Sequence, residues 1–417
     1  DHRDLHLSIR RQRQMCIRDS SLLYLLSLGH GLKHVFSSSV QVLLPFIKES
    51  LSLSGVQIGT LASANSISAG LVNVPAGLIA DVFKKRAGII IGFSAIMLSL
   101  GFLLVSFLSS SNWIILGFLA FIILGGGANL WHPPAFAVLS SKYPEKKAFA
   151  LGVHLSAASA GNALGPLLTG ALLSGAIISQ LFNMDLTWQS VAIIMFILCF
   201  LLAIIIFIFS SKISIDSSQT INFNNYFSKA FESLKRIEVL SMVLLHAIRQ
   251  SVHSAFTVYL LIYLKESLDL SAFSIGFHFS LIGISGVLFT PFWGSLSDKV
   301  GRLPVITLGM VLTSLFIFLI TFSSSGIMLI ILLLLLGCVL FAIIPVIAAA
   351  AMDYTVPGTE GTSVSLLFTG GAILGSIAPI IGGFFYDSSG FYSVLLFTSS
   401  LALFGTFISV IAWIKFK

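Results

Sequence analysis

Charged residues are scarce in this sequence. They occupy 9% of its 417 positions, whereas 56% of the residues are hydrophobic and the mean hydropathy is +1.01. Soluble domains use charged residues at about a quarter of their positions, because a surface that faces water needs them. Lipid must therefore cover much of this chain, which excludes a soluble fold. Apolar segments of about 20 residues cross a bilayer as helices, so we expect an all-α integral membrane protein.

Cysteine is scarce as well, and several chemical motifs are missing. The three cysteines, Cys16, Cys199 and Cys338, have no spacing typical of a disulfide scaffold, a redox motif or a zinc site. The chain lacks the Gly-Lys-Ser or Gly-Lys-Thr loop that holds nucleotide phosphates. No nucleophile–base pair stands out, and no histidine pair is backed by a carboxylate or a cysteine. We therefore expect no enzyme, no cofactor and no metal site, with a gradient rather than ATP as the driving force.

Long apolar windows recur along the chain and predict twelve membrane-spanning helices. The predicted ranges are 21–47, 55–80, 87–108, 113–140, 147–177, 188–210, 239–264, 272–297, 303–322, 327–353, 360–386 and 390–415. We interpret residues 1–20, which are polar and lack apolar periodicity, as a segment outside the fold, either non-native or a disordered tail. The predicted domains are an N-terminal six-helix bundle at 21–210, a linker at 211–238 and a C-terminal six-helix bundle at 239–417.

The positions of the basic residues predict the orientation of the chain. The loops after the even-numbered spans are rich in Lys and Arg, whereas the opposite loops hold only Lys48 and Lys265. Basic loops stay on the cytoplasmic side, so both termini are expected there, in a bacterial or archaeal plasma membrane. Of the net charge of +7, residues 1–20 contribute five Arg and three Asp, and the remaining +5 is too small and scattered to indicate nucleic-acid binding. Lipid is the expected partner because of the apolar composition.

The two halves of the chain repeat each other. Residues 48–54 recur with one substitution at residues 265–271, an offset of 217 because 265 − 48 = 217. The pairs Gly77 with Gly294 and Asp81 with Asp298 follow the same offset. Several matches in order at one offset indicate a duplicated six-helix unit. Such a unit is typical of transporters that rock one half against the other.

Two loops at equivalent positions share a pattern of glycine, aspartate and basic residues. Glycine permits close helix contact, aspartate ends a helix and can form an ion pair, and basic residues bind lipid headgroups. Such a loop can latch neighbouring helices in one of two states; charge that only sets topology is the alternative. The predicted latch residues are Gly77, Asp81, Lys85, Arg86, Gly294, Asp298, Lys299, Gly301 and Arg302.

These loops, the twelve-span plan and the repeat resemble the major facilitator superfamily over residues 21–417. A narrower likeness is to the fosmidomycin-resistance group of that superfamily, whose members are regarded as exporters of drugs or small organic anions. The motifs that carry it are His30 with Leu44 and Pro45, Gly125 to Gly127 with His132 and Pro133, and Gly161 and Asn162 with Leu164, Gly165 and Pro166. The chain departs from both patterns: Lys84 stands where a glycine is usual, and His34 where the group tends to have an acidic residue.

Two stripes of polar residues lie on the first and seventh predicted spans. Lys33 and Arg249 are at equivalent positions, 216 residues apart, and no Asp or Glu lies in the middle of a predicted span. Ionisable groups at membrane depth cost about 2.5–3.5 kcal/mol each, so they need a role. We expect both cations to bind an organic anion, although snorkelling or neutralisation of Lys33 is an alternative. The predicted substrate-binding residues are His30, Lys33, His34, Gln41, His246, Arg249, Gln250 and His253.

Histidine and proline supply the remaining candidates. His30, His132 and His246 are the predicted proton carriers, because imidazole titrates near physiological pH; hydrogen-bonded packing is the alternative for any one of them. Small residues and prolines in the fourth, fifth and eleventh spans are predicted hinges, with plain packing as the alternative. These hinge residues are Pro133, Gly161, Gly165, Pro166, Gly375 and Pro379.

We therefore expect a secondary active transporter, a monomer, that moves a small organic anion or drug by alternating access. A proton gradient or exchange with a counter-anion would drive it, and the narrower resemblance favours export. The second hypothesis is import of a carboxylate or phosphorylated nutrient through the same site. The third hypothesis is a membrane sensor or scaffold without transport.

Overall fold

The computed structural model of this chain describes residues 2–175, 186–215, 228, 232, 235–323, 325–355 and 360–416. Within these ranges it leaves the side chains of residues 2–20, 74, 81, 148 and 360–365 undescribed. Most of the predicted linker at 211–238 lies outside the described residues, so the linker stays a prediction. The same holds for the side chain of the latch residue Asp81.

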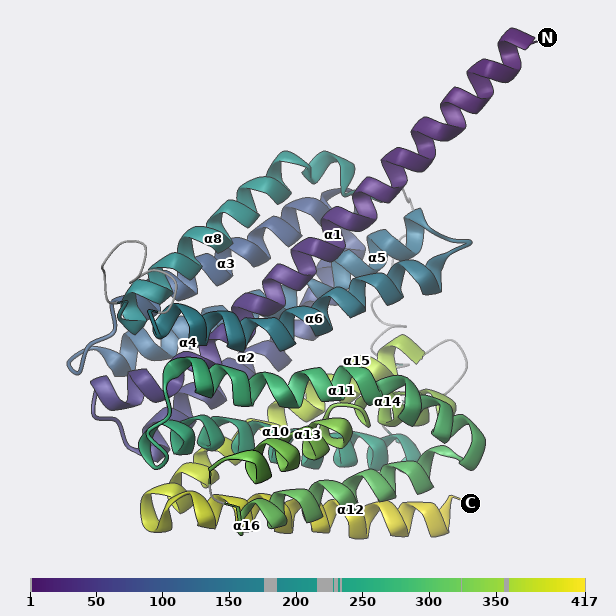
Figure 1. Cartoon of the computed structure of the whole chain (residues 1–417). Coiled ribbons are helices and arrows are strands. Elements are labelled where there is room, and N and C mark those ends of the chain that lie inside the picture. Colours follow the sequence, from purple (N-terminus) through teal and green to yellow (C-terminus); the bar gives the residue numbers. More distant parts are fainter. Residues whose placement is uncertain are drawn as a thin grey trace.

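The described residues form helices joined by short turns and include no β-strand (Figure 1). The first group of helices is α1 (His2–Ser50), α2 (Gly55–Val82), η1 (Lys84–Arg86), α3 (Ala87–Ser106), η2 (Trp113–Gly117), α4 (Phe118–Leu130), α5 (His132–Lys142), α6 (Lys147–Leu173), α8 (Trp188–Ile208) and η3 (Ser210–Lys212). The second group is α10 (Ile237–Glu266), α11 (Ala272–Val300), α12 (Arg302–Ile320), α13 (Ile327–Leu340), α14 (Ile344–Asp353), α15 (Glu360–Gly375) and α16 (Ile377–Lys415).

Most of the predicted ranges end within a few residues of these helices, and the exceptions have local causes. The helix α1 begins at His2 rather than at residue 21. The ranges 113–140 and 327–353 are each divided, because prolines occupy the first turns of α5 and α14 and provide no N–H for the preceding turn. The ranges 360–386 and 390–415 meet within α16, where Gly390 has a φ of 72° and interrupts the helix.

The outer surface is apolar enough to lie in lipid. Seven segments of the described chain are long and apolar enough to cross a membrane. On α8, for example, Ile193, Ile197 and Leu201 are exposed along one face. Such an apolar stripe is unfavourable on a surface that faces water. The helices α1, α2, α6 and α10 are outside this set of seven, because they carry polar residues that are buried in the protein.

The helices pack as two groups that meet at a few crossings (Figure 1). Within the first group α1 packs on α6, α3 on α8 and α2 on α4. Within the second, α10 packs on α15 and α16, and α11 on α13. Between the groups α6 crosses α11, α2 crosses α15 and α16, and α1 contacts α10. The polar helices α1 and α10 therefore lie where the two groups meet.

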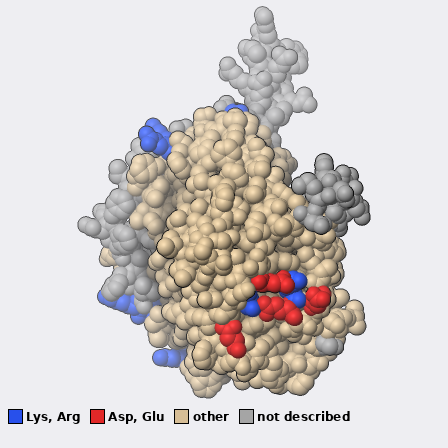
Figure 2. All heavy atoms as spheres, turned by 90° about the vertical axis from the view of Figure 1, so that its left-hand side faces the viewer, with Lys and Arg blue, Asp and Glu red and all other residues tan. Residues whose placement is uncertain are grey.

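The ends of α1 and α10 hold the two groups together through reciprocal ion pairs. Lys48 Nζ lies 2.6 Å from Glu266 Oε1, and Lys265 Nζ lies 3.5 Å from Glu49 Oε2. Figure 2 shows acidic and basic side chains gathered on a face that is otherwise largely uncharged; we call the end of the molecule with the two ion pairs the Lys48 end. The turns that follow the two helices also correspond, because Ser52 and Asp269 adopt left-handed φ values of 53° and 46°. The repeat in the sequence thus places each Lys-Glu pair opposite its own copy.

Glycines distinguish the Lys48 end from the opposite end. A Cβ added to Gly59 would collide with the Pro379 carbonyl, and one added to Gly276 with the Pro166 carbonyl. These backbones cross between the two groups in contacts that a larger residue would prevent. At the opposite end, which we call the Arg302 end, a Cβ on Gly77 or Gly294 would meet nothing within 4 Å. The close contact expected of those two latch glycines is therefore absent in this conformation, in which the Lys48 end is the tightly packed one.

The ion pairs of the Lys48 end provide a direct test of this closure. We expect Lys48→Glu to open the end, because it replaces an attraction to Glu266 by a repulsion. Pairs with this exposure contribute up to about 1 kcal/mol, so the ratio of closed to open molecules should fall roughly fivefold. Spin labels at Ser50→Cys and Ser267→Cys, in a background without native cysteines, measure the change as a longer label-to-label distance.

The swapped variant Lys48→Glu/Glu266→Lys is the matched control, because it restores the attraction with reversed polarity. Its distance distribution should return to that of the unchanged protein. If the single and the double variant open to the same extent, these charges do not hold the end closed.

Candidate functional site

Lys33 lies near the middle of the part of α1 that packs in the fold, and its side chain is 1% exposed. Its Nζ atom donates to His34 Nε2 at 3.1 Å and to His132 Nε2 at 3.0 Å. His132 begins α5, where Pro133 and Pro134 break the helix that leads into it. Among the described side chains, no carboxylate lies within ion-pair distance of Lys33. This buried cation is therefore bound only to neutral nitrogen acceptors.

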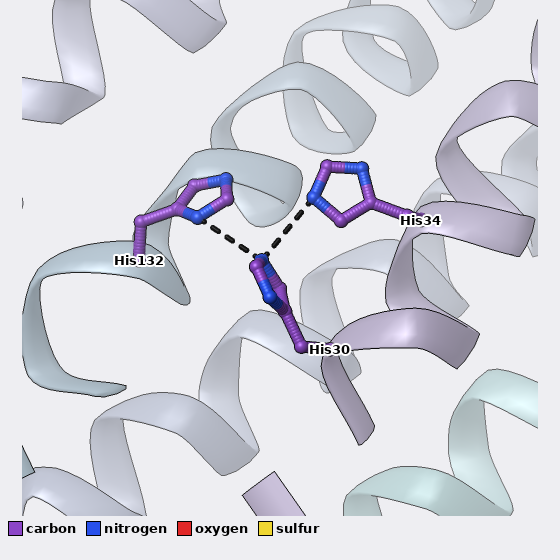
Figure 3. A group of neighbouring side chains, drawn as sticks. All are labelled: His30, His34 and His132. Atoms are coloured by element: carbon purple, nitrogen blue, oxygen red, sulfur yellow. Dashed lines mark hydrogen bonds between the residues drawn. The ribbon is translucent and has the colours of Figure 1, made fainter. Parts of the chain in front are cut away.

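Histidines from three helices surround Lys33, and their hydrogen bonds define which ring nitrogens carry hydrogen. His30 Nδ1 donates to the His154 carbonyl at 3.0 Å, and His34 Nδ1 donates to Asn162 Oδ1 at 3.0 Å. The Nε2 atom of each neutral ring is then an acceptor. These two Nε2 atoms nevertheless lie only 3.2 Å apart, and His132 Nδ1 lies 3.2 Å from His30 Nε2. Figure 3 shows His34 and His132 both pointing toward His30.

Arg249 occupies the corresponding place in the second group of helices. It is 2% exposed near the middle of α10, and its Nε donates to the Leu340 carbonyl at 2.7 Å. That carbonyl is available because α13 ends at Leu340 and the Ile344 N–H bonds to Phe341 instead. One terminal nitrogen, Nη1, donates to Gln250 Oε1 at 2.9 Å, whereas Nη2 is buried without a partner. Each cation thus contacts a broken helix, Lys33 at the α4–α5 junction and Arg249 at the α13–α14 junction.

A small pocket lies between α1, α2 and α10. Its lining is Ser37, Val40, Gln41, Leu44, Ala62, Asn65, Ser66, Phe121, Gln250, His253, Ser254, Thr257, Val258 and Pro379. Most of these side chains are small, polar or aliphatic, and buried polar groups such as Gln41 Oε1 and His253 Nδ1 have no protein partner. Apolar side chains with a few convergent polar groups are typical of a site for a small organic molecule.

Some of the predicted substrate-binding residues line this pocket and the others do not. Gln41, Gln250 and His253 line the pocket, whereas Lys33, Arg249, His30, His34 and His246 do not. Arg249 reaches the pocket through Gln250, which accepts its hydrogen bond. Lys33 lies one helical turn from Ser37, on the same face of α1. His246 packs against Gly371 and lies edge-on to the Phe368 ring at 5.1 Å.

Two asparagines of this region were not among the predicted site residues. Asn65 on α2 lines the pocket and donates to the Phe121 carbonyl at 3.2 Å. Asn162 on α6 orients the His34 ring. An asparagine in an apolar segment is the signal that could have identified both, because an amide at membrane depth needs a partner.

The predicted hinge residues lie at close helix crossings. A Cβ on Gly161 would collide with the Gly31 carbonyl, and one on Gly165 with Ser38 Oγ, so α6 packs tightly on α1 at both positions. Gly375 packs on Gln250 in the same way. Pro133 begins α5, and Pro166 lies inside α6. The Pro379 carbonyl accepts the Tyr259 hydroxyl at 2.6 Å. Close packing is thus the role these positions have here, and a hinge stays a prediction.

The second predicted latch loop forms a polar cluster at the Arg302 end. Arg302 Nη1 lies 2.5 Å from Asp298 Oδ1 and donates to Ser297 Oγ at 2.6 Å. Its Nε lies 3.2 Å from Asp353 Oδ2, at the end of α14. Gly301 has a φ of 97°, a conformation that favours glycine. In the first loop, Lys85 and Arg86 belong to the short helix η1. The arrangement of the second loop fits a latch between α11, α12 and α14.

Comparison with known proteins identifies related sequences and folds. Residues 26–248 and 240–416 match the family model described as Major Facilitator Superfamily. The Multidrug resistance protein MdtG of Klebsiella pneumoniae is 25% identical over 398 residues, which cover 92% of each chain. The multi-drug resistance efflux pump PmrA homolog of Lactococcus lactis is 24% identical over 314 residues, 72% of this chain and 73% of that one. The relatives are named for multidrug resistance, so the likeness to the fosmidomycin-resistance group stays a prediction.

Solved structures share the fold at lower identity. A bacterial homolog of the human lysosomal transporter Spinster, in an inward-facing and unoccupied conformation, superposes with a TM-score of 0.78 at 17% identity, over 95% of this chain and 97% of that one. The nucleoside transporter NupG superposes with a TM-score of 0.72 at 14% identity, over 94% of this chain and 99% of that one.

Proposed function

This chain belongs to the major facilitator superfamily, and from that premise we propose that it carries a small organic anion or anionic drug across the membrane by alternating access. The family and the relatives named above are membrane transporters and not enzymes. The substrate class, the direction and the driving force are the parts that we add. Each is argued below from the contacts of the buried polar residues.

We propose that the two groups of helices are the two six-helix halves of a twelve-span transporter with both termini in the cytoplasm. The 217-residue repeat, the equivalent left-handed turns at Ser52 and Asp269, and the reciprocal Lys–Glu pairs support this division. With this orientation the Lys48 end faces outward and is closed. The state opposite to this one would pack Gly77 and Gly294 closely and separate the Lys48 end.

The observation that supports an anionic substrate is the buried guanidinium of Arg249, one nitrogen of which has no hydrogen-bond partner. Nη2 has no partner in the protein, and no described carboxylate lies within ion-pair distance of Arg249 or Lys33. A charge removed from water needs a counter-charge, and a guanidinium offers a planar pair of donors to a carboxylate or phosphonate. We infer that the transported molecule supplies that counter-charge next to Gln250, at the edge of the pocket.

For the driving force we propose either a proton gradient, carried by His30 and His132 with His246 as the candidate in the other half, or exchange with a counter-anion. The hydrogen-bonded chain from Lys33 through His132 to His30 supports the first option. Export is the direction we favour, because relatives of this chain are named for drug resistance. A transport rate that stays constant between about pH 5.5 and 8 would count against the histidines as proton carriers.

Counterflow in proteoliposomes tests the proposal. The purified protein is reconstituted with a panel of labelled carboxylates, phosphonates, and neutral and cationic drugs, with and without a pH gradient. We expect exchange of at least one anion, competed by other anions and not by cations. Exchange of only neutral or cationic compounds would overturn the anionic substrate. Uphill uptake toward the cytoplasmic side would favour a nutrient importer, and absence of any flux would favour a sensor or scaffold.

A further inference from the structure

The cluster of His30, His34 and His132 has the composition of a transition-metal site. One ring nitrogen from each residue lies within 4.8 Å of the others, and no other described group of three or more His, Cys, Asp and Glu side chains comes this close. His30 and His34 come from α1 and His132 from the start of α5, and His30 is completely buried. The absence of oxygen ligands from this set argues against Ca²⁺ and Mg²⁺, because those ions prefer oxygen ligands.

The spacing of the nitrogens fits one ion. His30 Nε2 lies 3.2 Å from both His34 Nε2 and His132 Nδ1. Two imidazole nitrogens that share one Zn²⁺ at about 2.0–2.1 Å in tetrahedral geometry are about 3.3 Å apart. The nitrogens of His34 and His132 lie within 4.8 Å of each other, and both rings point toward His30 (Figure 3).

Hydrogen bonds already orient two of the rings as metal ligands. A histidine that binds a metal usually donates its other ring N–H to a carbonyl or carboxylate oxygen, which fixes the tautomer. His30 donates Nδ1–H to the His154 carbonyl, and His34 donates Nδ1–H to Asn162 Oδ1. Their Nε2 atoms lie 3.2 Å apart, and in the absence of metal His34 Nε2 accepts from Lys33 Nζ while His30 Nε2 accepts from His132 Nδ1. A metal ion that binds these lone pairs would replace both hydrogen-bond donors.

We propose that His30, His34 and His132 bind a borderline transition-metal cation, of the Zn²⁺ or Ni²⁺ type, inside the first half of the transporter. Three neutral imidazoles leave such an ion its full charge and an open coordination position. The positive charge of Lys33, 3.0–3.1 Å from two of these rings, opposes the metal. The amine must therefore withdraw when the metal enters, and the two cations compete for one place.

Metal binding to the full-length, untagged protein in detergent tests the proposal without any transport assay. Isothermal titration with ZnCl2 and NiCl2 should give one equivalent per chain. Co²⁺ should give the intense visible absorption of a four-coordinate ion. We expect His34→Gln and His132→Gln each to weaken binding by at least about tenfold. His278→Gln, which changes a histidine of α11 that bonds only to its own helix, should leave binding unchanged.

Two further variants keep the test decisive where a ligand variant fails to fold. Asn162→Ala removes only the oxygen that orients His34, and should weaken binding by about tenfold or more. Lys33→Met removes the competing charge, and should strengthen it. Stoichiometric binding that His34→Gln and Asn162→Ala leave unchanged would overturn the proposal, as would no binding to either the unchanged protein or Lys33→Met. Failure here would leave the anion site at Arg249 untouched, because that site lies in the other half.

Discussion

The variant Arg249→Gln is expected to lose anion transport and, at the same time, to melt at a higher temperature than the unchanged protein. Both effects follow from one feature, a guanidinium that is 2% exposed and has no carboxylate partner among the described side chains. Hydrogen bonds to a charged group contribute about 1.5–3 kcal/mol, so the loss of this contact should weaken anion binding roughly 10- to 150-fold.

Stability should rise although transport falls, because the ligand-free protein bears the cost of burying the charge. An isolated buried charge costs on the order of several kcal/mol even after relaxation, and the glutamine that replaces Arg249 has no charge to bury. A gain of about 1–3 kcal/mol would raise the melting temperature by several degrees, since about 1 kcal/mol corresponds to roughly 2–4 °C in units of 150–250 residues. Differential scanning fluorimetry in detergent measures it, and counterflow measures the loss of transport.

Arg236→Gln is the matched control, because Arg236 is exposed at the start of the same helix and donates to the Tyr354 carbonyl. It should change neither property. Arg249→Lys keeps the charge without the planar fork, so partial transport is expected. An Arg249→Gln protein that transports with unchanged affinity would refute the role of Arg249 in substrate binding, whatever its melting temperature.

The variant Gly276→Val is expected to reduce transport to a few per cent or less by preventing closure of the Lys48 end. A Cβ at this position collides with the Pro166 carbonyl, and backbone atoms cannot move aside as a side chain can. The contact joins α11 to α6, one helix from each group, so the packing within each group is not affected. Gly59→Val should act in the same way where α2 meets the Pro379 carbonyl.

Accessibility of a cysteine in the pocket measures this effect. With Ser37→Cys in a background without native cysteines, an impermeant thiol reagent added from the Lys48 side should react faster in Gly276→Val. Gly294→Val is the informative comparison, because a side chain there meets nothing within 4 Å in this state. It should hinder the opposite state and slow the same reaction. Equal reactivity in the two variants would contradict the assignment of the Lys48 end as the closed one.

Much of the membrane fold could be predicted from the sequence because lipid imposes strong and local constraints. An apolar run must satisfy its backbone hydrogen bonds internally, so the described part of each predicted range lies on one helix or on consecutive helices. The breaks before α5 and α14 follow from proline. The interruption of α16 at Ser389 and Gly390 lies where the predicted ranges 360–386 and 390–415 adjoin, whereas the division between α15 and α16 at Ser376 was not predicted.

The candidate site could be predicted only in part, since spacing along one helix does not reveal contacts between helices. The stripes with Lys33 and Arg249 were visible as residues three or four positions apart. Their partners were not: His132 is 99 residues from Lys33, and Leu340 is 91 residues from Arg249. The pocket lining differs from the predicted set for the same reason, because the side chains of both cations bond to broken helices and are not among the residues that line the pocket.

By itself the sequence determined that this chain lies in a membrane, that its halves repeat, and that two cations are buried at equivalent depths. Composition, periodicity and a constant offset are properties of the chain alone. In lipid, an apolar chain has few ways to satisfy its backbone hydrogen bonds. Only the tertiary structure decided that Lys48 and Glu49 meet their own copies across the halves and that three histidines converge beside Lys33. Such contacts depend on how helices far apart in sequence cross, and many residues contribute to that packing at once.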